Sequence, residues 1–177
     1  MAAASSAILV LESSGVERPF DDLRYRPPLW STCSQSIKAW ERTKMSTLTH
    51  RGGCHCGAVT FEIEAPAHLE THTCNCSICD RVRYQHLIVP QSKFRLLSGE
   101  DCLSRYTFGS HQAEHWFCQN CGIKSFYKPR SNPDGISVNA RCLDPGTVAS
   151  ITDSPFDGQN WEKNAHSLAH LSSETAE

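Results

Sequence analysis

Hydrophobic and polar residues alternate over short stretches in the second part of the chain. The clearest stretch is residues 59–64, Val-Thr-Phe-Glu-Ile-Glu, in which apolar side chains occupy every second position. A period of two is typical of a half-buried β-strand. Further short strands are expected over residues 86–89, 94–97, 103–108, 114–118, 123–127 and 136–138. The pattern predicts a mainly β fold built from short antiparallel strands.

Turn-forming residues separate these strands and keep the connections short. They are the pairs Ser98-Gly99, Gly109-Ser110, Asn132-Pro133 and Asp134-Gly135. Only residues 160–171 have the features of a helix, so we expect one helix near the C-terminus. The first 45 residues lack sustained periodicity. We therefore predict a flexible N-terminal extension over residues 1–47, one domain over residues 48–165 and a polar tail over residues 166–177.

Length and charge exclude several classes of protein. With 177 residues, the chain has room for one domain and a tail. Its 17 Lys and Arg nearly balance 19 Asp and Glu, so we expect no nucleic-acid partner. No apolar run approaches the ~18 residues that a transmembrane helix needs, so no membrane partner is expected either.

The N-terminus bears on the compartment and therefore on the state of the cysteines. The apolar run at residues 7–11 is short for a secretory signal, and no Lys or Arg precedes it. We expect an intracellular protein, cytoplasmic with the nucleus as an alternative, and there clustered cysteines usually bind metal. Translation could start at Met1 or at Met45, which directly precedes the cysteine-rich part.

Ten cysteines are the most informative feature of the composition. Four of them, the four-cysteine group, form two pairs: Cys54 with Cys56, and Cys118 with Cys121. Three others, the triad, lie together between these pairs: Cys74, Cys76 and Cys79. Cysteines two or three positions apart are poorly placed for a disulfide but can occupy corners of a zinc tetrahedron. The remaining three are isolated: Cys33, Cys102 and Cys142.

The number of clustered cysteines is consistent with two zinc ions per chain. A structural zinc site takes four ligands, whereas a catalytic site takes three from the protein and keeps one position open. The four-cysteine group could close the first site, and the triad could hold the second zinc alone. The alternative is a single structural zinc, with the triad recruiting Cys102, Cys142 or a histidine as a fourth, closed ligand.

An open zinc site with three thiolates favours chemistry at sulfur. Such a site suits a soft fourth ligand, and zinc deprotonates a bound thiol at neutral pH. Four basic residues near the cysteines could bind carboxylates of a small anionic thiol: Arg81, Arg83, Lys128 and Arg130. His55 and His86 are the nearest candidates for proton transfer. Each basic residue could instead be a solvated surface charge, and each histidine a packed one.

Three cysteine motifs follow one another in the domain. They are residues 53–59, Gly-Cys-His-Cys-Gly-Ala-Val; residues 74–79, Cys-Asn-Cys-Ser-Ile-Cys; and residues 117–122, Phe-Cys-Gln-Asn-Cys-Gly. Together they resemble the signatures of the centromere protein V / glutathione-dependent formaldehyde-activating enzyme family. The segments 125–127, 129–133 and 142–144 resemble the centromere protein V branch in particular.

The resemblance implies a small zinc-bound domain of the Mss4-like, or β-tent, type. In the family pattern, the four-cysteine group (Cys54, Cys56, Cys118 and Cys121) holds a structural zinc. The triad (Cys74, Cys76 and Cys79) holds a more exposed, catalytic-type zinc. The family's activity is that of a carbon–sulfur lyase, the reversible addition of glutathione to formaldehyde to give S-(hydroxymethyl)glutathione. The extension of residues 1–45 is not notably basic, so a centromeric role is not implied.

Two functions therefore compete. The first is a zinc-dependent enzyme of the carbon–sulfur lyase type that acts on glutathione or a similar thiol and an aldehyde such as formaldehyde. The second is a non-catalytic zinc module for protein interaction, which a shared fold cannot exclude. An exposed apolar patch without thiol binding would favour the second. A disulfide-rich secreted domain is a third possibility, which the missing signal opposes.

Overall fold

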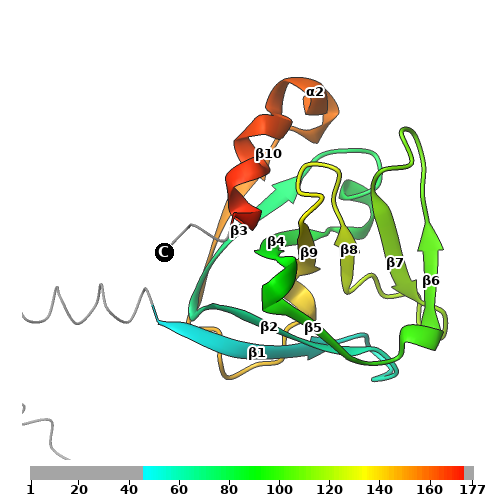
Figure 1. Cartoon of the computed structure of the whole chain (residues 1–177), viewed down its shortest axis with the longest axis vertical. Coiled ribbons are helices and arrows are strands. Elements are labelled where there is room, and N and C mark those ends of the chain that lie inside the picture. Colours follow the sequence, from blue (N-terminus) through cyan, green and yellow to red (C-terminus); the bar gives the residue numbers. More distant parts are fainter. Residues whose placement is uncertain (1–45, 174–177) are drawn as a thin grey trace, which may run out of the picture.

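The strands of the protein form two sheets, seen in the computed structural model, which describes residues 46–173 (Figure 1). The small sheet has the order β1-β2-β5 and the large sheet the order β10-β3-β4-β9-β8-β7-β6. The small sheet consists of β1 (Thr47–Gly53), β2 (Thr60–Pro66) and β5 (Phe94–Ser98). The large sheet consists of β3 (His68–Cys74), β4 (Gln85–Pro90), β6 (Leu103–Tyr106), β7 (Glu114–Cys118), β8 (Phe126–Lys128), β9 (Gly135–Asn139) and β10 (Ser150–Phe156). The predicted mainly β class is confirmed.

Apolar side chains from both sheets meet in one core. Phe61 of β2 and Val138 of β9 have no exposed surface. The Phe61 ring stacks on Phe94 of β5 at 5.8 Å and meets the edge of Phe126 of β8 at 5.9 Å. Full burial of one such side chain stabilises the fold by about 1.5–3 kcal/mol. The alternation in residues 59–64 thus identified β2, the strand of the small sheet whose Phe61 packs against the large sheet.

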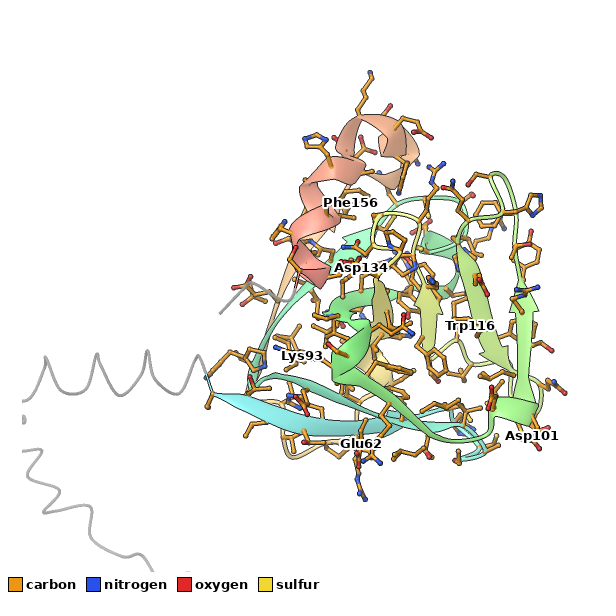
Figure 2. The ribbon with its side chains drawn as sticks, viewed as in Figure 1. Glu62, Lys93, Asp101, Trp116, Asp134 and Phe156 are labelled. Carbon is orange, nitrogen blue, oxygen red and sulfur yellow. The ribbon has the colours of Figure 1, made fainter. Side chains whose placement is uncertain are left out.

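One polar residue of this strand is also buried. Glu62 is only 7% exposed, although alternation predicts that it faces solvent. Its carboxylate accepts hydrogen bonds from Arg51 at 2.8 Å and from Arg95. Burial raises the pKa of Glu62, but the two guanidinium groups outweigh it and hold the pKa below its usual value. Figure 2 shows Glu62 at the end of the molecule opposite Phe156.

Three strands were not predicted from the alternation of apolar and polar residues: β1, β3 and β10. The strand β10 is exposed along almost its whole length, so its sequence shows no apolar face from which a strand could be predicted. It pairs in parallel with β3, with Cys74 opposite Phe156. The large sheet is therefore mixed, where only antiparallel pairs were expected. A parallel pair needs a long crossover, and no local pattern predicts which distant segment will return.

Two predicted strands are shorter than expected. The strand predicted over residues 103–108 ends at Tyr106. The strand predicted over residues 123–127 begins only at Phe126. The reason for the late start is that the Ile123 carbonyl accepts a 3.0 Å hydrogen bond from the Cys118 N–H, which closes a turn.

The predicted C-terminal helix is present, but most of it is not α-helical. The α-helix α2 covers only Trp161–Asn164, between the 3₁₀ segments η6 (Gly158–Asn160) and η7 (Ala165–Ser172). The Asn132 side chain donates hydrogen bonds of 2.9 Å to the Leu168 carbonyl and of 2.9 Å to Ser172 Oγ. Leu168 and Ser172 are buried. Residues 166–172, which the sequence assigned to a polar tail, therefore pack against the domain.

Some predictions concern residues that the structure does not describe. Residues 1–45 and 174–177 lie outside the described range, and with them most of the predicted extension and the end of the tail. Thr47, counted in the extension, is the first residue of β1. Within residues 46–173, no helix has the length and apolar character needed to cross a membrane.

Candidate metal centres

The four sulfurs of the four-cysteine group converge on one point. They lie within 4.8 Å of one another, although two come from residues 54–56 and two from residues 118–121. Cys56 Sγ is 3.5 Å from Cys54 Sγ and 3.6 Å from Cys118 Sγ. A tetrahedron with Zn–S bonds of 2.3 Å has sulfurs about 3.8 Å apart. The donor set and the spacing both fit a closed zinc site.

Two similar turns hold these sulfurs. The first turn links β1 to β2, and the second links β7 to β8. Gly57 N–H donates to the Cys54 carbonyl at 3.1 Å, and Gly122 N–H donates to the Cys118 carbonyl at 2.8 Å. Both glycines have left-handed backbone, with φ of 76° and 73°. A residue with a side chain is disfavoured there, so each glycine sets the turn that places its cysteine pair.

The triad converges at a separate place. Cys74 ends β3, and Cys76 and Cys79 lie on the turn that leads into the 3₁₀ segment η2 (Asp80–Val82). The three sulfurs lie within 4.8 Å of one another, and no further His, Cys, Asp or Glu of residues 46–173 joins them. Cys102 and Cys142 belong to neither group, and Cys33 lies outside the described residues. The geometry therefore fits a zinc site with an open position.

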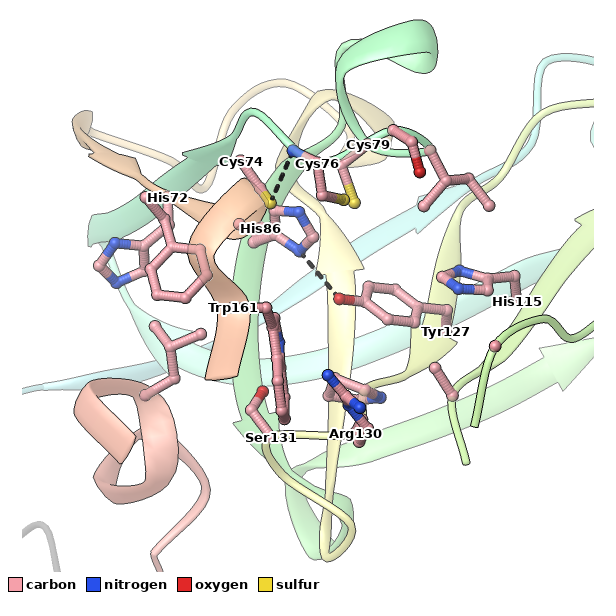
Figure 3. Close-up of a pocket in the computed structure, with 18 of the residues that line it drawn as sticks. His72, Cys74, Cys76, Cys79, His86, His115, Tyr127, Arg130, Ser131 and Trp161 are labelled. Atoms are coloured by element: carbon pink, nitrogen blue, oxygen red, sulfur yellow. Dashed lines mark hydrogen bonds between the residues drawn. The ribbon is translucent and has the colours of Figure 1, made fainter. Parts of the chain in front are cut away.

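Hydrogen bonds among the triad residues shift the pKa values of the three thiols in opposite directions. The Cys76 backbone N–H donates to Cys74 Sγ at 3.4 Å (Figure 3). Hydrogen bonds from the thiols of Cys74 and Cys79 lower the pKa of Cys76. The same contacts raise the pKa of Cys74 and of Cys79. The nine described cysteines are all free thiols. Metal binding requires free thiols, whereas a disulfide framework would have them bonded in pairs.

The segment after β10 packs directly on the triad. The Asn75 N–H donates to the Phe156 carbonyl at 3.3 Å, and Asn75 Oδ1 accepts from the Gln159 N–H at 2.9 Å. Gly158 is buried, and a Cβ atom there would overlap Cys74 Sγ. A glycine is therefore required for this close approach of the backbone to the sulfurs. Neither Asn75 nor Gly158 was predicted, because their partners are distant in sequence.

A pocket of about 460 Å³ opens onto the triad. Its walls include all three triad cysteines but no member of the four-cysteine group. Aromatic side chains form much of the rest: Phe108, Tyr127, Phe156 and Trp161. This volume lies within the roughly 300–1,000 Å³ range of small-molecule sites. All three triad cysteines thus face one pocket, whereas of the four-cysteine group Cys54 lines a second, smaller pocket of about 320 Å³ and Cys56 is exposed.

Two buried histidines line the pocket. His86 Nδ1 lies 3.1 Å from Ser137 Oγ and 3.3 Å from Tyr127 Oη (Figure 3). His86 Nε2 has no hydrogen-bond partner among the described residues, and neither has His115 Nδ1. In Figure 3 the Nε2 edge of His86 faces the triad sulfurs. Burial lowers the pKa of His86 and of His115 to about 4, so both rings are neutral at pH 7.

Only part of this pocket wall was predicted from the sequence. His86 was a candidate and lies in the pocket, whereas His55 is exposed and does not line it. His115 was missed, although it lies on β7 only three positions before Cys118. Tyr127 was missed as a pocket residue, because its ring reaches the site through stacking on His115 at 4.8 Å. Nothing in a single strand's pattern predicts that contact.

Of the four basic residues near the cysteines, one lines the pocket. Arg130 does so, and its guanidinium carbon lies 3.3 Å from the centre of the Trp161 ring. Arg83 instead forms an exposed ion pair with Asp80 at 3.3 Å. Arg81 and Lys128 are not among the pocket-lining residues. Trp161 lies in α2, which sequence analysis treated only as part of a helix.

Comparison with known proteins agrees with these features. The family model described as "Glutathione-dependent formaldehyde-activating enzyme" matches residues 49–158, which contain both cysteine groups. A Rhodobacter sphaeroides protein of known crystal structure is 35% identical, with a TM-score of 0.49. The match covers 58% of this chain and 99% of that one. The chain belongs to the glutathione-dependent formaldehyde-activating enzyme family.

Proposed function

We propose that this protein is a zinc-dependent enzyme of the carbon–sulfur lyase type. Its substrates would be glutathione, or a similar thiol, and an aldehyde such as formaldehyde. The observation that carries this proposal is that all three triad cysteines line one pocket of about 460 Å³, whereas Cys54 alone of the four-cysteine group lines a pocket, a smaller one of about 320 Å³. A metal that only stabilises the fold has no need of such a pocket. Membership of the family supports the same chemistry.

The two cysteine groups take different roles in this proposal, with one zinc each. Cys54, Cys56, Cys118 and Cys121 hold a structural zinc, because their four sulfurs complete a tetrahedron. Cys74, Cys76 and Cys79 hold a catalytic-type zinc with an open position. When bound at the triad, zinc would lower the pKa of a coordinated thiol and so supply a thiolate at neutral pH.

The protein's own residues position the aldehyde beside that sulfur. The reaction forms a bond between sulfur and the aldehyde carbon, opens the carbonyl double bond and moves one proton from the thiol to the oxygen. His86 and Tyr127 lie beside the triad as neutral hydrogen-bonding groups, and the unpartnered His86 Nε2 is suited to contact the aldehyde oxygen. The surrounding aromatic side chains limit the access of water.

The similarity to the centromere protein V branch remains part of the proposal. It rests on residues 125–127, 129–133 and 142–144. Within these segments, Tyr127 and Arg130 line the pocket and Asn132 anchors η7. The branch-like residues therefore act, in this proposal, on the shape of the pocket rather than on metal binding.

A binding experiment tests the proposed function. Glutathione is titrated calorimetrically into the zinc-loaded protein and into the zinc-loaded Cys76→Ser variant. We expect saturable binding to the wild-type protein and a large loss of binding in the variant. Cys102→Ser is a matched control, because Cys102 belongs to neither sulfur group. Absence of binding to the wild-type protein would contradict the proposal and favour an interaction module.

A further inference from the structure

Arg130 gives the pocket a charged end. It is the only Arg or Lys among the residues that line the pocket, and no Asp or Glu lines it. Burial lowers the pKa of all three lining histidines, His72, His86 and His115, so they are neutral at pH 7. In Figure 3, Arg130 and Trp161 lie together on the side of the pocket opposite the triad, with His86 and Tyr127 between. The permanent positive charge is thus concentrated away from the sulfurs.

Trp161 fixes the orientation of this guanidinium group. The guanidinium carbon lies 3.3 Å from the ring centre, so the flat group stacks against the indole. The five N–H donors of arginine lie in the guanidinium plane. Stacking therefore uses the face of the group and leaves its edge for hydrogen bonding. A planar carboxylate is the ligand that matches two parallel N–H donors on that edge.

A carboxylate of the protein already contacts this edge. Glu162 Oε1 lies 3.1 Å from Arg130 Nη2. The Glu162 side chain is 81% exposed, whereas that of Arg130 is 27% exposed. An ion pair with so exposed a partner contributes little to stability. A ligand carboxylate can therefore replace Glu162 while Trp161 keeps Arg130 in place.

We propose that Arg130, stacked on Trp161, is a carboxylate-binding subsite that makes the pocket selective for thiols carrying a carboxylate. The inference rests on the proposed function, because Arg130 lines the same pocket that would receive the thiol substrate. The sulfur of the ligand lies at the triad, its apolar part between the aromatic walls and its carboxylate at Arg130. Thiols without a carboxylate lose this contact.

Three ligands separate the subsite from the metal site. Glutathione has both a thiol and carboxylates, glutathione diethyl ester has the thiol without free carboxylates, and S-methylglutathione has the carboxylates without the thiol. Each is titrated calorimetrically into zinc-loaded wild-type protein, Arg130→Gln and Arg83→Gln. Arg83 is the matched control because it is an exposed arginine outside the pocket.

We expect the wild-type protein to bind glutathione about 10- to 100-fold more tightly than the diethyl ester, as for a charge-assisted hydrogen bond. In Arg130→Gln the two affinities become equal, and in Arg83→Gln the wild-type ratio remains. Arg130→Lys retains part of the preference, because the charge remains and the planar fork is lost. This variant also serves if Arg130→Gln does not fold.

The outcomes distinguish the two proposals. An unchanged ratio of glutathione to ester affinity in Arg130→Gln and in Arg130→Lys would overturn the subsite while leaving thiol binding at the triad intact. Equal binding of glutathione and S-methylglutathione, both weakened in Arg130→Gln, would support the subsite and contradict thiol binding at the metal. No binding of any ligand to the wild-type protein would overturn both.

Discussion

Single residues decide how strongly each cysteine group is tied to the fold. Cys118 is 1% exposed and lies in the hydrophobic core, where its neighbours come from both sheets. Cys76 is half-buried on the pocket wall. The four-cysteine group joins two distant segments, whereas the triad sulfurs all come from residues 74–79. Loss of one ligand should therefore have different consequences in the two groups.

The Cys118→Ser variant should unfold, and the Cys76→Ser variant should not. Structural zinc supplies on the order of 10 kcal/mol of folding free energy in small domains, which is comparable to the whole stability of a typical protein. Circular dichroism during heating and zinc content by atomic absorption would measure the two effects. We expect Cys76→Ser to keep its fold and about one zinc per chain. Equal loss of structure in both variants would contradict the division of roles.

Gly158→Ala should disturb the triad and spare the four-cysteine group. The new Cβ would overlap Cys74 Sγ and lie 3.0 Å from Cys76 Cβ, and such overpacking costs about 1–3 kcal/mol. We expect weaker zinc binding at the triad in competition with a chromogenic chelator, with zinc binding at the four-cysteine group unaffected. Gln159→Ala, next in the chain, is the control for general loosening of this segment. Unchanged triad affinity in Gly158→Ala would show that the backbone can shift without effect.

At the level of elements, the pocket depends on a segment that is only partly helical. Trp161 and Leu168 line the pocket from α2 and η7. The position of η7 depends on Asn132, which lies in the loop between β8 and β9 and is 1% exposed. Its amide donates to the Leu168 carbonyl and to Ser172 Oγ. One loop residue thus connects the end of the chain to the large sheet.

Asn132→Ala should loosen η7 without unfolding the domain. Loss of these buried hydrogen bonds should cost about 1–3 kcal/mol, because the carbonyl of Leu168 loses its donor. Hydrogen exchange should rise in residues 161–172 and remain unchanged in β2 and β9. The control is Asn164→Ala, whose amide bonds to carbonyls of Asp157 and Asn160 on the exposed surface. Equal exchange in both variants would contradict the anchoring role.

The features that were predicted correctly depend on residues that lie close together in the sequence. Apolar alternation identified β2, and cysteine spacing identified both sulfur groups, because each signal lies within a few residues. The strand β10 could not be predicted, since its stability comes from pairing with β3 rather than from an apolar face. Gly158 and Asn75 were missed for the same reason: their importance comes from contacts between distant segments. Glu62 was misplaced because arginines on two neighbouring strands allow its burial.

Across the whole molecule, the two sulfur groups differ in access. The four-cysteine group joins the turn after β1 to the turn after β7, outside the pocket. The triad faces a pocket that a small molecule can enter. In the proposed arrangement, the catalytic-type zinc is therefore the one whose three ligands all face the larger pocket.

Chelation should remove zinc in two separate phases. A chelator added to the zinc-loaded protein should first take about one zinc per chain with no change in circular dichroism. The zinc of the four-cysteine group should leave more slowly and together with unfolding, because its loss removes a link within the core. Zinc release followed with a chromogenic dye, alongside circular dichroism, measures both phases. A single phase coupled to unfolding would contradict independent centres.

The pairing of β3 with β10 also has a consequence for synthesis. Asn75 bonds to Asp157, which lies 82 positions later in the chain. All cysteines of the four-cysteine group precede residue 122, whereas the segment that packs on the triad follows β10. Because a chain is synthesised from its N-terminus, all seven clustered cysteines leave the ribosome before the segment that packs on the triad. The wall of the pocket is therefore complete only after residues 156–168 have been synthesised.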